Sequence, residues 1–379
     1  MAYSLRRSRW PVLVLLIGFA VASCTSTHST PRASSPHTTA PVSGSNPAPG
    51  GPGGGRNGVV AGQVVGPWKA TTVGGAIEHA NPLAGTHRSL YLRDNRDLVR
   101  VDVATGGTEA RKRMGSTPGR LLIVGGLVWD IPSSTSSGRL HLVGLNPMTL
   151  DRIRTVSLPG VGPPGQLVGS AADARGQRLY VGVGKTIFVV GTRRRHLVAR
   201  YLAPGPSISA LALSPNRTRL YVTWNIPNGA TSGLAALDPR TGAALAGPVL
   251  FYGGSTVSSV SAGGVWLANG QGMTQTLTFH PADNLAQPIA TAATYAGGGW
   301  IVDSTVDDDV VWIGGTTTLA CADPLTGRVR ARTKVPTPHR DAANIGSLVI
   351  AGGRLYAYYM TDFRVTNLLI QLSPPAACR

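Results

Sequence analysis

The chain has 379 residues and a formal net charge of +18 at pH 7, from 35 lysines and arginines against 17 carboxylates. This excess of positive charge favours anionic lipid head groups or acidic polymers as partners. Nucleic acid is not expected, because no RNA- or DNA-binding motif accompanies the charge. Glu78 and Glu109 are the only glutamates, so a paired-carboxylate mechanism would have to draw on aspartates, most of which fall in predicted turns.

The first 23 residues predict an export signal. Three arginines precede the apolar stretch Trp10–Ala22, which is shorter than the ~20 residues of a membrane-spanning helix. The stretch ends in Val21-Ala22-Ser23-Cys24, which resembles the bacterial lipobox, in which the cysteine is lipidated and becomes the mature N-terminus. The alternative is an ordinary secretory signal with an incidental Cys24. The resemblance implies a lipid anchor at Cys24 on the extracytoplasmic side of the cell membrane.

Residues 24–58 predict a flexible tether. After Cys24, Ser, Thr, Pro, Gly and Ala dominate, with no aromatic residue, leucine or isoleucine. Such a segment buries too little apolar surface to offset the entropy lost on ordering. The folded domain is therefore expected at 59–379.

An aliphatic–aromatic pair recurs seven times in short strand-like runs, at intervals of 38 to 51 residues. The pairs are Leu90-Tyr91, Val128-Trp129, Leu179-Tyr180, Leu220-Tyr221, Val265-Trp266, Val311-Trp312 and Leu355-Tyr356. A period in the forties is typical of four-stranded blades in a ring. The sequence therefore predicts an all-β fold, a seven-bladed β-propeller of four-stranded blades.

The clearest repeat predicts strands at 208–213, 219–224, 233–237 and 243–249. Its third and fourth strands are joined by the turn Asp238-Pro-Arg-Thr-Gly242, which recurs at Asp323–Gly327. Weaker echoes occur at Asp102–Gly106, Asn146-Pro147 and His280-Pro281. This D-P-x-T-G turn, with an R-L-Y-V strand before it, resembles the YVTN, NHL and quinoprotein-type propellers. The resemblance implies the fold and leaves the chemistry open.

The two ends of the domain are predicted to meet. The last repeat has strands near 345–351, 354–360 and 367–372 and lacks an outer strand, while valines at 59, 60, 64 and 65 have no blade of their own. We expect the N-terminal segment to pair into the last blade and close the ring, which removes an exposed sheet edge. Cys321 and Cys378 either form a disulfide between the last two blades or remain two buried thiols.

No catalytic or metal motif is evident. Asp307-Asp308-Asp309 departs from the spacing of a calcium loop and predicts a solvated turn, so no metal or cofactor is expected. The basic runs Arg111–Arg113 and Arg193–His196 predict either a solvated rim or a contact with anionic lipid or polymer.

Propeller ligands usually bind at the mouth of the central channel, on loops that enter the inner strands and leave the second strands. The candidates there are Asp130, Trp224, Asn225, Asn269, Gln271, His339, Arg340, Asp341, Asp362 and Arg364. Together the features favour a binding or scaffolding module for an envelope protein or an anionic envelope component. The alternative is a lyase or hydrolase with a channel-mouth site centred on His339 and Asp341.

Overall fold

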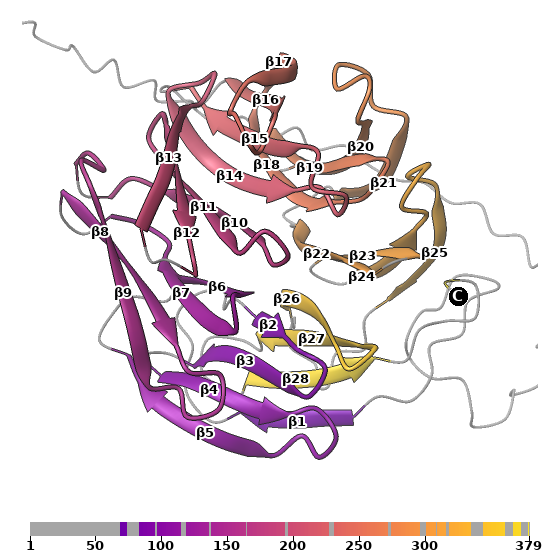
Figure 1. Cartoon of the computed structure of the whole chain (residues 1–379). Helices are drawn as coiled ribbons and strands as arrows, with labels where there is room; N and C mark the ends of the chain where they lie inside the picture. The colour runs from indigo at the N-terminus through magenta and orange to yellow at the C-terminus, as the bar shows by residue number, and fades with distance from the viewer. Residues whose placement is uncertain are drawn as a thin grey trace, which may run out of the picture. The chain divides into compact units, whose positions relative to one another are not determined.

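The computed structural model describes residues 69–73, 83–94, 97–114, 119–135, 138–163, 165–193, 196–226, 231–271, 274–295, 301–307, 309–315, 318–334, 344–360, 367–372 and 378. All of them belong to one compact unit, Gly55–Arg379. Strands β1 to β28 of this unit form seven antiparallel sheets of four strands, set around a ring as the blades of a β-propeller (Figure 1). The predicted all-β, seven-bladed fold is confirmed.

The first three blades run in chain order from the inner to the outer strand. Blade 1 contains β2 (Leu83–Gly85), β3 (Ser89–Asp94), β4 (Asp97–Asp102) and β5 (Thr108–Arg113). Blade 2 contains β6 (Gly119–Val124), β7 (Leu127–Pro132), β8 (Arg139–Leu145) and β9 (Arg152–Pro159). Blade 3 contains β10 (Val168–Asp173), β11 (Arg178–Val183), β12 (Thr186–Gly191) and β13 (His196–Leu202).

The next three blades follow the same order. Blade 4 contains β14 (Ser207–Leu213), β15 (Leu220–Asn225), β16 (Thr231–Leu237) and β17 (Ala244–Tyr252). Blade 5 contains β18 (Gly254–Val260), β19 (Gly264–Gln271), β20 (Thr274–Pro281) and β21 (Ala290–Tyr295). Blade 6 contains β22 (Ile301–Asp307), β23 (Val310–Gly315), β24 (Thr318–Ala322) and β25 (Val329–Lys334). The four strands predicted in the clearest repeat are those of blade 4, with the outer strand continuing to Tyr252.

Blade 7 joins the two ends of the unit. It contains β26 (Asn344–Ala351), β27 (Arg354–Met360) and β28 (Asn367–Leu372), and its outer strand is β1 (Lys69–Val73). β1 pairs antiparallel with β28, Lys69 opposite Gln371 and Val73 opposite Asn367. Closure by an N-terminal strand is therefore confirmed, while the valines at 59–65 lie outside the described residues.

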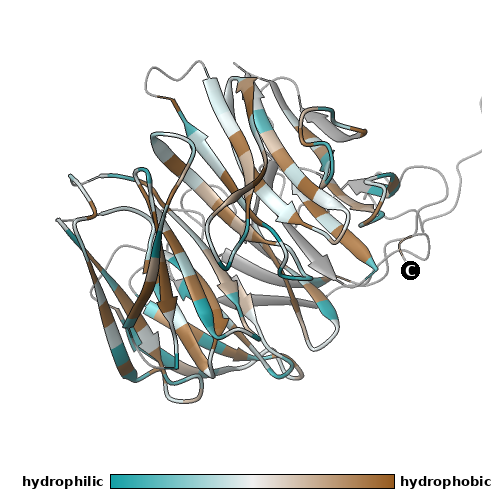
Figure 2. Cartoon of the chain, turned by 45° about the horizontal axis from the view of Figure 1, so that its top comes forward, coloured by the Kyte–Doolittle hydropathy of each residue, from teal (hydrophilic) through white to brown (hydrophobic). Residues whose placement is uncertain are grey.

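The hydrophobic core is distributed between the blades. The second strands are apolar on both faces, as in β15, where five consecutive residues are buried, because each is covered by the two neighbouring blades. Buried residues form clusters that each join two adjacent blades, and each inner strand contacts the inner strand of the next blade around the ring. In Figure 2 hydrophobic segments run through the strands, while hydrophilic ones are frequent at the turns and along outer strands.

Turns between third and outer strands tie several blades to the one before them. In blade 4 the Asp238 carboxylate accepts hydrogen bonds from the amides of Arg240, 2.7 Å, and Thr241, 3.4 Å. Tyr180 of blade 3 donates its hydroxyl to the Pro239 carbonyl in the same turn, 3.1 Å. At this junction the aromatic residue of the repeated pair thus holds the next blade's turn.

The same contact occurs at two further blade junctions. Tyr91 donates to the Pro147 carbonyl, 3.0 Å, and Tyr356 of blade 7 donates to the Val103 carbonyl of blade 1, 3.1 Å. The Ser261 hydroxyl donates to the Pro324 carbonyl at the junction of blades 5 and 6. The predicted echoes of the D-P-x-T-G turn at Asp102 and Asn146 therefore occupy the equivalent place in their blades.

Glycine pairs at the first turns serve two different purposes. Gly125-Gly126 and Gly352-Gly353 adopt positive φ, between 55° and 74°, as a tight hairpin requires. Gly263, at the first turn of blade 5, does not adopt positive φ. A Cβ at this position would lie 2.5 Å from the Leu325 carbonyl oxygen, so here the glycine permits close approach of the blade 6 turn.

Candidate functional site

Two of the predicted channel-mouth residues are buried between blades. Asp130 is 3% exposed and lies 3.8 Å from the Arg93 guanidinium of blade 1, which is itself fully buried. Burial lowers the pKa of Arg93, and the neighbouring carboxylates of Asp130 and Asp97 oppose this shift. Asp130 is therefore part of the contact between blades 1 and 2.

Trp224 is a core residue between two glycines. Its side chain is 2% exposed, and a Cβ on either Gly205 or Gly233 would overlap the indole. The bare backbone at these glycines makes room for the ring. Its burial leaves the Trp224 ring almost inaccessible to a ligand.

Asn269 begins a buried hydrogen-bond chain in blade 5. Its amide donates to the Thr278 hydroxyl, 3.0 Å, which lies 2.9 Å from His280 Nε2. His280 Nδ1 lies 2.8 Å from the Leu285 carbonyl oxygen, which can only accept, so Nδ1 carries the proton and Nε2 accepts from Thr278. Burial lowers the pKa of His280, which keeps this imidazole neutral near pH 7. The spacing of these residues in the sequence did not predict this series of hydrogen bonds.

The remaining candidates do not complete a site in the described part of the chain. Asn225 is half-buried at the end of β15, and Gln271 ends β19. The others lie outside the described residues: His339, Arg340, Asp341, Asp362 and Arg364. The site predicted at 339–341, with a histidine, an arginine and an aspartate in one loop, thus stays a prediction.

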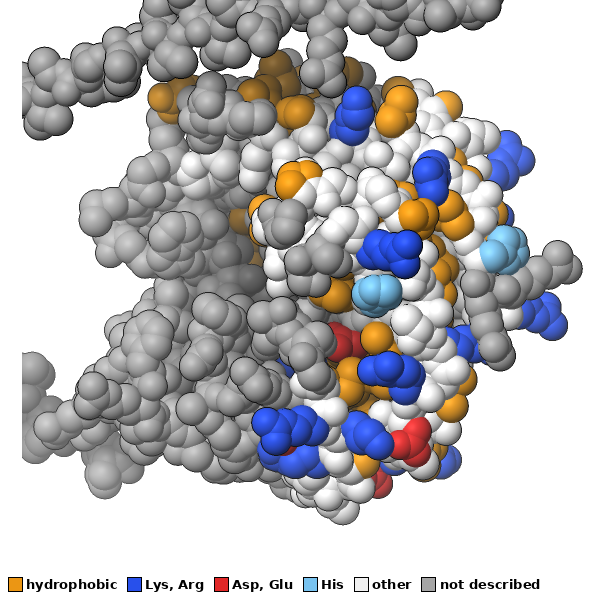
Figure 3. Space-filling model, turned by 90° about the vertical axis from the view of Figure 1, so that its left-hand side faces the viewer, with side chains coloured by type: hydrophobic (Ala, Val, Ile, Leu, Met, Phe, Trp, Pro, Cys, Tyr) orange, Lys and Arg blue, Asp and Glu red, His pale blue; other side chains and the backbone are white. Residues whose placement is uncertain are grey.

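The outer strands carry a large share of the positive charge and almost no negative charge. Arginines and lysines number three in β5, two in β9, one in β13, three in β25 and one in β1, whereas Glu109 is the single carboxylate in any outer strand the structure describes. We call this set the basic rim: Lys69, Arg111, Lys112, Arg113, Arg152, Arg154, Arg200, Arg330, Arg332 and Lys334. Figure 3 shows one side of the molecule, where Lys and Arg side chains outnumber acidic ones.

Carboxylates neutralise the basic rim only in part. Arg111 pairs with Asp97 at 3.1 Å and Lys112 with Asp151 at 2.8 Å, both at the surface, where such pairs contribute little stability. Arg200 instead lies over the Phe188 ring of β12, 5.4 Å from its centroid, a cation–π contact that holds the guanidinium against the third strand of its own blade.

Several aspartates near the rim are committed to their own turns. The hydrogen bond from Arg330 and the backbone amide of Thr326 hold the pKa of Asp323 well below its usual range. A hydrogen bond from the Thr105 amide likewise lowers the pKa of Asp102. Asp323 thus also neutralises one cation of the basic rim, through its 2.6 Å ion pair with Arg330, whereas Asp102 is held within its own turn.

Two kinds of feature are absent from the part of the chain that the structure describes. It contains no group of three or more His, Cys, Asp or Glu side chains placed to hold a metal ion. It also contains no helix long and apolar enough to cross a bilayer.

Comparison with known proteins identifies only the fold of this chain. No protein-family model and no curated protein sequence matches the chain. Among solved structures, hydrazine synthase of Kuenenia stuttgartiensis is similar, with a TM-score of 0.55 and 12% identity, over 76% of this chain and 98% of that chain. The likeness is one of architecture.

Two further structures agree. A chain of the Mitotic Checkpoint Complex has a TM-score of 0.58 and 11% identity, over 81% of this chain and 93% of that chain. U3-55K has a TM-score of 0.60 and 12% identity, over 80% and 98%. One propeller architecture thus occurs in proteins as different as a synthase and a member of a checkpoint complex, so function has to be argued from this chain's own residues.

Proposed function

We propose that this chain is a lipid-anchored, extracytoplasmic β-propeller that acts as a binding or scaffolding module for an anionic component of the cell envelope. The basic rim carries the proposal: its outer strands hold many cations and one carboxylate. Outer strands are the part of a blade that other blades do not cover, so their side chains are the ones available to a large partner.

Rigidity supports a scaffolding role. The ring is closed by β1, hydrophobic clusters pack each blade against the next, and tyrosine hydrogen bonds add to three of these junctions. A surface of fixed cations binds a polyanion without paying for the ordering of the protein chain. The similar chain in the Mitotic Checkpoint Complex belongs to a protein complex, which supports an assembly role for this architecture.

The anchor is proposed from the sequence alone. Lipidation at Cys24, followed by the tether at 24–58, would keep the folded unit near the outer face of the membrane, where anionic lipids and polymers are concentrated. Replacing Cys24 with serine should release the protein from the membrane fraction of cells. Unchanged membrane partition of C24S would contradict the anchor.

The rim is tested with soluble polyanions. Full-length lipidated protein, immobilised in non-ionic detergent, is titrated with polyphosphate and with poly-L-glutamate from about 0.05 to 0.5 M NaCl, a range over which screening increases strongly. The variant R113Q/R152Q/R200Q removes three cations from the rim. Its control, R88Q/R240Q/R354Q, removes three exposed cations elsewhere.

We expect both polymers to bind, more weakly as salt rises, and the rim variant to lose more affinity than its control. Equal losses would mean that net charge, and not the rim, attracts the polymer. Absence of polyanion binding would contradict the proposed function. If a discrete protein were instead recovered in a complex that survives high salt, the partner of the scaffold would be that protein and not an anionic polymer.

A further inference from the structure

A basic hollow lies at one end of blade 3, at the turns β10–β11 and β12–β13. It has a volume of about 400 Å³, and its lining includes Arg178, Arg193, His196, Gln177 and Val198 around Gly191. In an antiparallel blade these two turns share one end, and the loops predicted to form the channel mouth lie at the other. The hollow is thus distinct from the predicted mouth.

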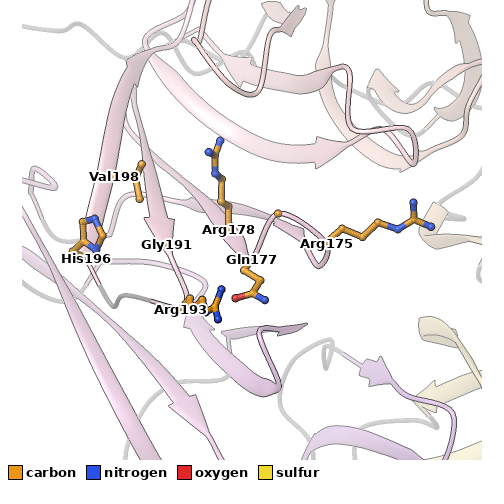
Figure 4. A pocket seen from close by; sticks show the side chains of 8 residues that line it. Arg175, Gln177, Arg178, Gly191, Arg193, His196 and Val198 are labelled. Atoms are coloured by element: carbon orange, nitrogen blue, oxygen red, sulfur yellow. The ribbon is translucent and has the colours of Figure 1, made fainter.

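Glycine at position 191 keeps the hollow open. In Figure 4 Gly191 lies between Val198 and His196 on the β13 side and Arg178 on the other; the Arg178 side chain points away from Gln177 and Arg193, which lie next to each other. A Cβ on Gly191 would lie 3.0 Å from Val198 Cγ2. A larger side chain on this strand would therefore occupy the space.

Hydrogen bonds hold the backbone of the two turns together, so the positions from which the lining side chains extend are fixed without a ligand. The Gln177 carbonyl accepts two hydrogen bonds from Thr192, from its amide at 2.8 Å and its hydroxyl at 2.9 Å. The Asp173 carboxylate accepts the Gly176 amide at 2.7 Å, which fixes the first turn. Gln177 itself has φ of +51°, a conformation that these bonds maintain.

Positive charge dominates the hollow. Arg175, whose side chain points away from the others in Figure 4, also contributes to the lining, and no lining residue is a carboxylate. The nearby Asp173 carboxylate accepts a bond from its own turn and lies 3.8 Å from Arg217 of blade 4. Among the described residues, neither Arg175 nor Arg193 forms an ion pair.

We infer that this hollow binds an organic phosphate, with the phosphoryl oxygens held by Arg193 and Gln177, which lie next to each other. A guanidinium and an amide side by side offer several N–H donors to an oxyanion, and Arg178 adds positive charge to the hollow. The volume exceeds that of a phosphate ion, and Val198, 46% exposed, offers an apolar wall for a carbon substituent. The inference deepens the proposed function, because phosphate esters occur in both anionic polymers and lipid head groups.

The test is calorimetric titration of the full-length lipidated protein in non-ionic detergent, at constant ionic strength. The probes are glycerol 1-phosphate, glycerophosphoglycerol (a phosphodiester head group without its acyl chains) and inorganic phosphate, with acetate as the comparison anion. Tighter binding of the diester would point to a polymer or lipid source, and tighter binding of the monoester or of inorganic phosphate to a free metabolite.

Three variants separate the site from general charge. R193Q should weaken phosphate binding about tenfold or more, as expected for the loss of a hydrogen bond to a charged group. R88Q, which removes an exposed cation from the corresponding first turn of blade 1, should leave it within about twofold of wild type. G191V fills the hollow without changing charge and should abolish binding while the thermal unfolding curve stays near that of wild type.

Three results would overturn the site: no saturable phosphate binding by wild type, equal effects of R193Q and R88Q, or wild-type affinity in folded G191V. Binding of acetate as tight as that of the phosphates would do the same. Polyanion binding is measured on the same preparations. Its persistence in G191V would show that the basic rim acts independently, and its absence in wild type would remove the proposed function even if the hollow binds phosphate.

Discussion

The disulfide between Cys321 and Cys378 offers the sharpest test of how the ring is held. It links β24 of blade 6 to a residue close to the C-terminal end of the chain, with a Cα–Cα distance of 5.9 Å, and both cysteines are almost fully buried. The bond spans a sequence separation of 57 residues. A loop of that length removes about 14 cal/mol/K of entropy from the unfolded chain, or about 4 kcal/mol at 25 °C.

This free energy converts into a melting shift. Unfolding entropy is about 2.1 cal/mol/K per residue, so for the unit Gly55–Arg379 a loss of 4 kcal/mol lowers Tm by about 6 °C. The variant C321A/C378A should show this shift in thermal unfolding followed by circular dichroism. Wild type melted with dithiothreitol is the matched control, because it keeps both sulfur atoms and lacks the bond.

The double variant should not respond to dithiothreitol. If oxidised wild type, reduced wild type and the variant all unfold within about 1 °C of one another, the loop-entropy reasoning fails for this ring. A shift in the variant alone would show that the packing of the sulfur atoms, and not the covalent bond, stabilises the junction.

Three further changes test other features of the fold. Y356F removes the hydroxyl that bonds the Val103 carbonyl across the closing junction, and should cost about 1 kcal/mol in denaturant unfolding, whereas Y252F, at a side chain 72% exposed, should cost nothing measurable. G205A should lower the free energy of unfolding by about 3 kcal/mol, because its Cβ would overlap Trp224. Its control G138A, whose Cβ would meet no atom within 4 Å, should unfold like wild type, and equal stabilities of the two variants would contradict the packing of Trp224. Burial lowers the pKa of His280, so below about pH 6.5 the unfolded chain binds a proton that the folded chain does not. The free energy of unfolding should therefore decrease as the pH is lowered through that range. H280N keeps a donor for the Leu285 carbonyl and should make the free energy of unfolding nearly independent of pH between about pH 6.5 and 5. If the slope is the same as in wild type, other titrating groups cause it.

The sequence predicted the propeller because its repeat is tied to packing. The Tyr of each Leu-Tyr pair sits on a second strand buried on both faces, so the pattern recurs wherever a blade recurs. Closure was predictable by counting strands, since the last repeat lacked an outer one. The exact closing strand, Lys69–Val73, was not, because its sequence has little of the apolar character of the valines before it.

The site was harder to predict because loops and burial depend on neighbours far away in sequence. Trp224 lies next to the end of a second strand and looked available to a ligand, yet glycines at 205 and 233 make a place for its ring inside the fold. Asp130 likewise meets Arg93 of another blade. The hollow around Gly191 combines two turns that the sequence separates, and a glycine in a strand gives no sign of what it leaves open.

The pairing of β1 with β28 also sets the order in which the fold can be completed. Lys69 is among the first residues of the propeller to be synthesised, and its partner Gln371 among the last. Until the final strands are present, β1 has no sheet to join, and the first six blades have to stand as an open arc with exposed edges. Such edges invite pairing with other chains, so the interval before closure is when aggregation competes with folding. The completed ring therefore depends on a contact that no partial chain can make.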